Sequence, residues 1–226
     1  MSDTPQAVNS WVYFFSGDRA CDFLNPLGNN DQTDYYRILD VVPVTGKIPV
    51  PMQTQELFVR LETAMPRPSL EAEAQWKGSV RHLNYTPATV RAELQKRSTG
   101  SYPASETTLA VMIPIRKSEK WWGLAQDERQ KYFDKKSGRQ NHTALGYDYA
   151  DRIYRKLYHS RYLESKTPLG YDFLTYFEFH EKDGELFKQL LGELRDLTMN
   201  PEWQFVDFEL EIWLSKKERR EGYEKN

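Results

Sequence analysis

The sequence predicts an α+β protein in which helices cover one face of antiparallel β-sheets. Strand-like and helix-like segments alternate with few residues between them, which is typical of this fold class. The clearest helix, at 184–197, is followed directly by the clearest strand, at 206–214. Two ferredoxin-like units would account for the 226 residues, although the two halves share no obvious sequence repeat.

These two C-terminal segments carry the strongest periodicity in the chain. The helical segment has one apolar stripe, formed by Leu186, Phe187, Leu190, Leu191, Leu194 and Leu197. In the strand segment the apolar residues Val206, Phe208, Leu210, Ile212 and Leu214 alternate with Asp207, Glu209, Glu211 and Trp213. The alternation predicts a half-buried strand.

The first half of the chain contains shorter signals. Its expected elements are strands at 11–17, 35–46 and 78–86, a polar loop at 25–34, and a helix at 87–97 that begins with Pro87. Prolines in 47–53 and 65–75 rule out long regular elements between the second and third of these strands.

The second half repeats the alternation after a candidate linker at 97–106. Besides the two segments above, its expected elements are a strand at 108–117, a helix at 118–136, a histidine-containing segment at 142–160 and a strand at 171–179. We therefore expect an N-terminal half at 1–100, a C-terminal half at 106–215 and a solvated charged tail at 216–226.

Composition narrows the class of protein. Hydrophobic residues make up 39% and charged residues 28%, which predicts a soluble globular protein. A formal charge of −2 gives no electrostatic reason to expect nucleic acid or an anionic membrane as partner. The single cysteine, Cys21, excludes an internal disulfide and a cysteine-based zinc site. With no visible signal peptide and no long apolar run, a cytoplasmic location is expected.

The histidines alone do not define a metal site. His142 and His159 are 17 positions apart, which fits neither an (i, i+4) helical pair nor the short spacing of a preformed metal site. A ligand role for either residue therefore needs a second signal.

Three segments supply that signal, namely "PIRKSEKWWGLAQDER" (114–129), "RKLYHS" (155–160) and "LTYFE" (174–178). Together they resemble the chlorite dismutase family of haem b proteins. In that family a distal arginine follows the proximal histidine after 13 residues, and here Arg155 follows His142 at that distance. The resemblance covers 106–215 well, whereas 1–75 matches mainly by length and order. It implies an α+β fold of the dimeric α+β barrel type.

The resemblance also implies the roles of individual residues. His142 would be the metal ligand, bound to haem iron, and Arg155 would be the catalytic cation that holds chlorite on the opposite face. The other expected cofactor contacts are Lys117 and Tyr85 at the propionates, Trp122 at the haem edge, and Leu157, Thr175 and Phe177 in the distal cavity. The implied reaction converts chlorite to chloride and dioxygen.

One feature departs from the family pattern. In efficient members, a glutamate late in the chain accepts a hydrogen bond from the proximal histidine, which raises imidazole basicity. The corresponding segment here, 194–205, has no glutamate in register, and Glu202 is nearby but displaced.

Two alternative functions therefore stay open. A coprohaem decarboxylase of the same superfamily is one, but that branch generally lacks the distal arginine. A haem-binding or haem-handling protein with weak peroxidase activity is the other. Family members are pentamers, or dimers when the first half is shortened; the long first half here favours a pentameric homo-oligomer.

Overall fold

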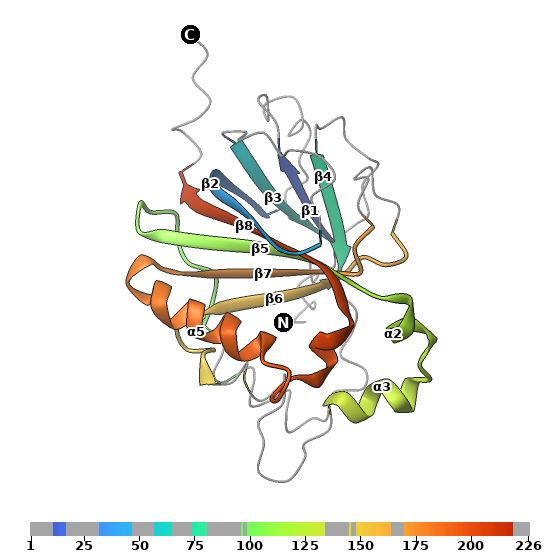
Figure 1. The fold of residues 1–226 in the computed structure, drawn as a ribbon. Coiled ribbons are helices and arrows are strands. Elements are labelled where there is room, and N and C mark those ends of the chain that lie inside the picture. Colours follow the sequence, from blue (N-terminus) through green and yellow to red (C-terminus); the bar gives the residue numbers. More distant parts are fainter. Residues whose placement is uncertain are drawn as a thin grey trace, which may run out of the picture.

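The computed structural model describes residues 11–16, 32–46, 57–64, 74–80, 96, 99–133, 145, 148–163 and 170–218 (Figure 1). Its eight strands form a closed barrel in the order β1-β3-β2-β8-β5-β7-β6-β4. The strands are β1 (Trp11–Ser16), β2 (Gln32–Thr45), β3 (Leu57–Thr63), β4 (Ala74–Ser79), β5 (Thr108–Lys117), β6 (Tyr154–His159), β7 (Phe173–His180) and β8 (Val206–Lys217).

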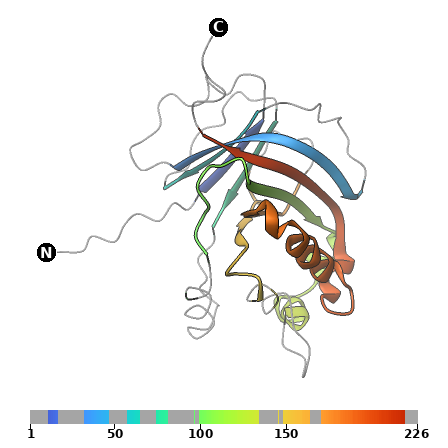
Figure 2. The ribbon, with the colours of Figure 1, turned by 90° about the vertical axis from the view of Figure 1, so that its left-hand side faces the viewer.

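The two halves of the barrel share one strand order. Counted within each half, both β1–β4 and β5–β8 follow the order fourth–first–third–second, with antiparallel pairing throughout. The halves join through a long β2–β8 ladder, which Figure 2 shows as two curved strands side by side, and through a single β4–β6 pair, Ser79 with His159. The antiparallel α+β class is as predicted. The ferredoxin-like unit stays a prediction.

Helices accompany the second half. They are α2 (Glu119–Gly123), α3 (Gln126–Phe133) and α5 (Gly184–Arg195), with 3-10 turns η2 (Glu181–Asp183) and η3 (Pro201–Phe205). Among the residues that the structure describes, no helix is long and apolar enough to cross a membrane.

The strongest sequence signals agree with these elements. β5 matches its predicted bounds, and α5 and β8 differ from theirs by a few residues at their ends. The single helix predicted at 118–136 is instead two helices, because the backbone is extended at Leu124, after α2. β8 continues to Lys217, and Lys216 is buried in ion pairs with Asp34 and Glu178, so the expected tail starts later than residue 216.

Strands β3 and β6 were not predicted, and β4 begins before the strand predicted at 78–86. β3 forms between the proline-containing segments, since the prolines flank it and none interrupts it. β6 carries cations on both faces and gave no apolar alternation. β4 ends near the start of the strand predicted at 78–86, most of which lies outside the described residues.

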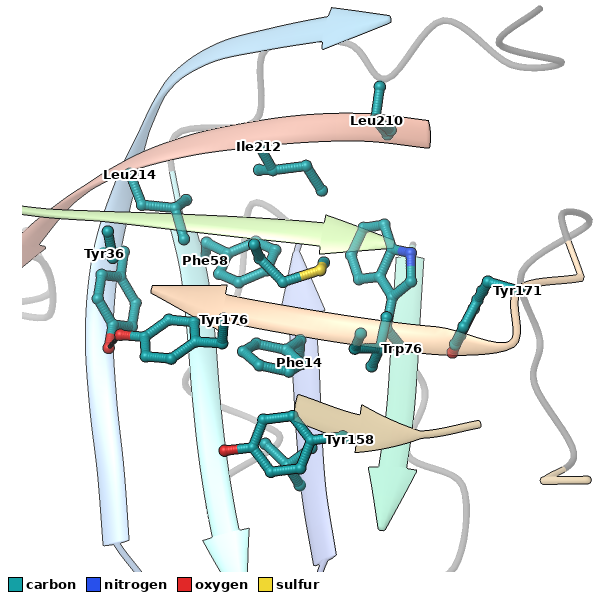
Figure 3. Packing of buried hydrophobic residues seen from close by; sticks show 14 of the residues in the cluster. Phe14, Tyr36, Phe58, Trp76, Tyr158, Tyr171, Tyr176, Leu210, Ile212 and Leu214 are labelled. Atoms are coloured by element: carbon teal, nitrogen blue, oxygen red, sulfur yellow. Dashed lines mark hydrogen bonds between the residues drawn. The ribbon is translucent and has the colours of Figure 1, made fainter. Parts of the chain in front are cut away.

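One hydrophobic core fills the barrel. Phe14, Phe58 and Trp76 from the first half meet Met112, Leu210, Ile212 and Leu214 from the second, all nearly inaccessible to solvent (Figure 3). A second core lies outside the barrel, where α5 packs on β5 and β7. Alternate residues of each C-terminal strand therefore serve two different cores.

A buried polar network continues from the interior core. Arg60 donates to Asp34 (2.7 Å) and Glu62 (2.5 Å), and Tyr158 donates to Glu62. The Tyr36 and Tyr176 hydroxyls lie 2.5 Å apart (Figure 3). Desolvation favours the neutral phenols and raises the pKa values of Tyr36, Tyr158 and Tyr176 well above the usual value.

Candidate functional site

A cavity of about 280 Å³ lies on the outer face of the C-terminal half of the barrel. Its floor consists of alternate residues from four adjacent strands, which point away from the barrel interior. The floor residues are Ile113, Ile115, Lys117, Arg155, Leu157, Phe173, Thr175, Phe177 and Glu209.

The strand register fixes how these floor residues lie. Arg155 pairs with Phe177, and Leu157 pairs with Thr175. Two residues further along β6, His159 begins a row across the sheet that passes through Phe173 and Ile115 to Glu209. The centre of the floor is thus apolar.

The roof comes from segments that follow β5 and β7. Leu191, Leu194 and Arg195 belong to α5, Glu202 and Trp203 belong to η3, and Trp121 belongs to α2. Helix α5 reaches the sheet because its Phe187, Leu190, Leu191 and Leu194 are buried in the outer core. Leu197, predicted to extend this stripe, lies beyond the helix end and is 56% exposed.

The structure brings together five of the predicted site residues. Lys117, Arg155, Leu157, Thr175 and Phe177 all line the cavity. Trp122 lies beside it, with its indole stacked on Phe173 at 6.0 Å and its Nε1 donating to Asp172 (3.1 Å). Its neighbour Trp121 lines the cavity instead. His142 and Tyr85 lie outside the described residues.

Arg155 brings a desolvated cation to the floor. Its guanidinium lies over the Phe177 ring, 5.6 Å from the centroid. Burial disfavours the charged form and lowers the pKa of Arg155 to about 10, so the side chain is still cationic near neutral pH. A desolvated guanidinium next to an apolar surface is suited to bind a small anion.

Lys117 is a second buried cation of the cavity. Its ammonium lies 3.8 Å from the centroid of the Trp121 ring and 3.4 Å from the backbone carbonyl oxygen of Glu202. Burial lowers the pKa of Lys117 to about 8, although the charges of Glu202 and Asp172 oppose that shift. Lys117 thereby joins the end of β5 to both α2 and η3.

Sequence reasoning missed the polar residues on the other side of the cavity. Glu209 and Glu211 lie on the face of β8 expected to be solvated, yet they are only 1% and 6% exposed, so the half-buried strand was a wrong prediction. Arg195, at the end of α5, covers them and donates to both carboxylates. In the sequence, only two features pointed to this cluster. Acidic residues alternate with apolar residues along β8, and a basic residue ends the preceding helix.

The outer core also includes residues close in sequence to His142. Leu145 is fully buried there, together with Tyr149 and Ile153. The chain therefore packs against the same face as the cavity three residues after His142.

Known proteins share this fold. The dimeric chlorite dismutase of Nitrobacter winogradskyi has a TM-score of 0.67 and 31% identity, over 91% of this chain and 99% of that one. A mutant chlorite dismutase of Candidatus Nitrospira defluvii, at 17% identity, shares the fold, with a TM-score of 0.61 over 93% of this chain and 92% of that one.

A curated chlorite dismutase is also similar to this chain in sequence. The chlorite dismutase of Ideonella dechloratans is 31% identical over 105 residues, which are 46% of this chain and 33% of that protein. The match thus spans about a third of that relative's length. No family model matches the chain.

Fold and site together define an antiparallel α+β barrel with an apolar, cation-bearing cavity on the outer face of its C-terminal half. Since the chain is 31% identical to a solved chlorite dismutase over nearly all of that protein, it belongs to the chlorite dismutase family.

Proposed function

We propose that the chain is a haem b-dependent chlorite dismutase that converts chlorite to chloride and dioxygen, forming the O–O bond. The observation that carries this proposal is Arg155, whose guanidinium lines an apolar cavity in a chain 31% identical to a solved chlorite dismutase. Relatives of this kind support the broader class of oxidoreductase or lyase.

The residues of the cavity fit a haem. The apolar centre of the floor suits the macrocycle, and the buried cation Lys117 at its margin suits a propionate. Leu145 supports His142 as the residue that would bind the iron, because three residues of chain span at most about 11 Å. When bound, the haem would supply a redox-active iron with one position open to a small anion.

The side chains of this protein have distinct proposed tasks. Arg155 would attract chlorite and keep its chlorine-containing part in the cavity, as a directed cationic donor can. Leu157, Thr175 and Phe177 restrict the space beside it to small anions. Lys117 and Tyr85 are the proposed propionate contacts, and Trp122 is the proposed residue at the haem edge.

Glu202 is the proposed hydrogen-bond acceptor of the proximal histidine. Its side chain is 1% exposed and lines the cavity roof in η3, although the sequence suggested that it was displaced. A carboxylate there would accept a hydrogen bond from the Nδ1–H of His142, orient the ring and raise its basicity.

Every described cavity residue lies within the proposed C-terminal half, 106–215. The boundary between this half and 1–100 stays a prediction, as does a cytoplasmic location. We also propose a homo-oligomer. The solved relative at 31% identity is dimeric, whereas the long first half favoured a pentamer; sedimentation velocity distinguishes the two.

An oxygen electrode tests the function directly. Haem-loaded protein given millimolar chlorite should release oxygen promptly and stoichiometrically, and Arg155→Ala should release little or stop early. Haem binding with no oxygen from either protein would reject the dismutase. It would favour a haem-handling protein or a coprohaem decarboxylase, which conversion of added coprohaem would reveal.

A further inference from the structure

A buried ion cluster joins the end of α5 to β8. Arg195 donates to Glu209 Oε1 from Nε (3.0 Å) and Nη2 (2.6 Å), and to Glu211 Oε1 from Nη2 (2.5 Å). If both carboxyls are ionised, two anions face one cation. Burial raises the pKa of Glu209, and the charge of Glu211 adds to this shift, while Arg195 opposes it.

The two carboxylates differ in what else they contact. Glu209 lines the cavity, as Glu202 does, and accepts two of the three hydrogen bonds that Arg195 donates to the pair. Glu211 instead accepts a hydrogen bond from Trp213 Nε1 (2.7 Å) and is not among the described residues that line the cavity. The pair therefore offers a natural comparison between a carboxylate at the site and one behind it.

Glu209 holds the start of the segment that carries Glu202. Arg195, which donates two hydrogen bonds to Glu209, lies immediately before the segment 196–202. Inside the segment, the backbone N–H of Asn200 donates to the Asp196 carbonyl (2.7 Å). A short segment that is held at its start and by its own backbone has little freedom to shift against the sheet.

We propose that Glu209 is a positioning residue that fixes the Glu202 carboxylate in the cavity wall through Arg195. This inference rests on the proposed function, in which Glu202 accepts a hydrogen bond from His142. A well-placed acceptor makes the imidazole a stronger donor to iron and stabilises ferric haem. Replacing Glu209 should therefore displace the Glu202 carboxylate and raise the reduction potential of the haem iron.

The first test measures the midpoint potential of the haem-loaded protein and of three single variants. Glu202→Gln should raise the potential, Glu209→Gln should raise it by less, and Glu211→Gln should leave it unchanged. Glu209→Gln and Glu211→Gln remove the same charge from the same cluster, so the second controls for electrostatics and folding. The double variant Glu202→Gln/Glu209→Gln should match Glu202→Gln alone. Additive shifts, or equal shifts for Glu209→Gln and Glu211→Gln, would overturn the proposal.

The second test does not depend on haem. Amide hydrogen exchange over 196–203 should accelerate in Glu209→Gln and stay at the wild-type rate in Glu211→Gln; unchanged exchange in Glu209→Gln would overturn the proposal. If Glu202→Gln leaves the potential unchanged, the proposed role of Glu202 fails, and the exchange rates still decide whether Glu209 holds the segment.

Discussion

Arg155 and Glu209 lie at diagonally opposite corners of one cavity floor. Arg155 belongs to β6 and Glu209 to β8, with two strands between them. At a strand spacing of about 4.8 Å, β6 and β8 are therefore about 14 Å apart across the sheet. Along the strands, Glu209 is level with His159, four residues beyond Arg155. The Arg155 corner therefore carries a cation, whereas Glu209 at the other corner is a carboxylate that Arg195 covers.

The guanidinium of Arg155 predicts where a small anion binds. Arg155→Gln in the haem-loaded ferric protein should weaken fluoride binding at least tenfold, because a hydrogen bond from a charged donor contributes about 1.5–3 kcal/mol. Spectroscopic titration gives the dissociation constant. Arg152→Gln is the control, since Arg152 belongs to the same segment but its side chain is 54% exposed and pairs with Asp183. Equal affinities in wild type and Arg155→Gln would contradict the distal role.

The buried Lys117 predicts an alkaline rise in stability. Its folded-state pKa of about 8 lies below the usual 10.5, so between these values the unfolded chain binds more protons than the folded one. The free energy of unfolding should therefore rise with pH in this window, by up to about 3 kcal/mol from this residue alone.

Lys117→Met isolates that contribution. Urea denaturation of wild type and variant at pH 7.5, 8.5 and 9.5 should show their difference changing steadily with pH, in favour of the wild type. These values stay below the range in which the buried tyrosines begin to titrate. A difference that is constant with pH would mean that Lys117 is not desolvated in the folded protein.

The elements predicted best are those with a simple apolar pattern. β5 and α5 have strongly apolar faces, and both appeared at nearly their predicted places. β6 did not, because Lys156 and Tyr158 face the barrel interior while Arg155 and Leu157 face the cavity. Neither face of β6 is uniformly apolar, so the strand that carries the proposed distal residue has no two-residue signal.

The cavity itself depends on contacts between distant parts of the chain. Arg155 and Lys117 could be named from a family motif, since each belongs to a continuous segment. Arg195 and Glu209 could not, because their pairing depends on α5 folding back over β8. An alternating acidic strand normally indicates a solvated face, and only the tertiary structure shows a guanidinium covering it.

The interior network predicts a large stability effect far from the cavity. Arg60→Met removes a fully buried cation from Asp34 and Glu62 and should cost about 3–5 kcal/mol, the usual result of breaking a buried ion pair. Arg116→Met is the control, because its partly exposed pair with Asp207 should contribute at most about 1 kcal/mol. Urea denaturation compares them, and similar losses would show that the Arg60 pairs are not energetically coupled to folding.

Gly78 predicts a link between the barrel seam and the site. A Cβ there would lie 2.6 Å from the Tyr158 Cβ, and Tyr158 cannot easily give way because its hydroxyl bonds Glu62 and Arg60. Gly78→Ala should cost about 1–3 kcal/mol by overpacking. It should also shift β6, and with it Arg155, relative to the rest of the floor.

Thermal unfolding and fluoride titration of haem-loaded Gly78→Ala should therefore show a lower melting temperature together with a higher dissociation constant. Gly123→Ala is the matched control, since a Cβ at Gly123 would meet nothing within 4 Å. It should change neither quantity appreciably. If Gly78→Ala lowered stability but left fluoride affinity unchanged, Arg155 would be held independently of the β4–β6 seam, through its ladder with β7.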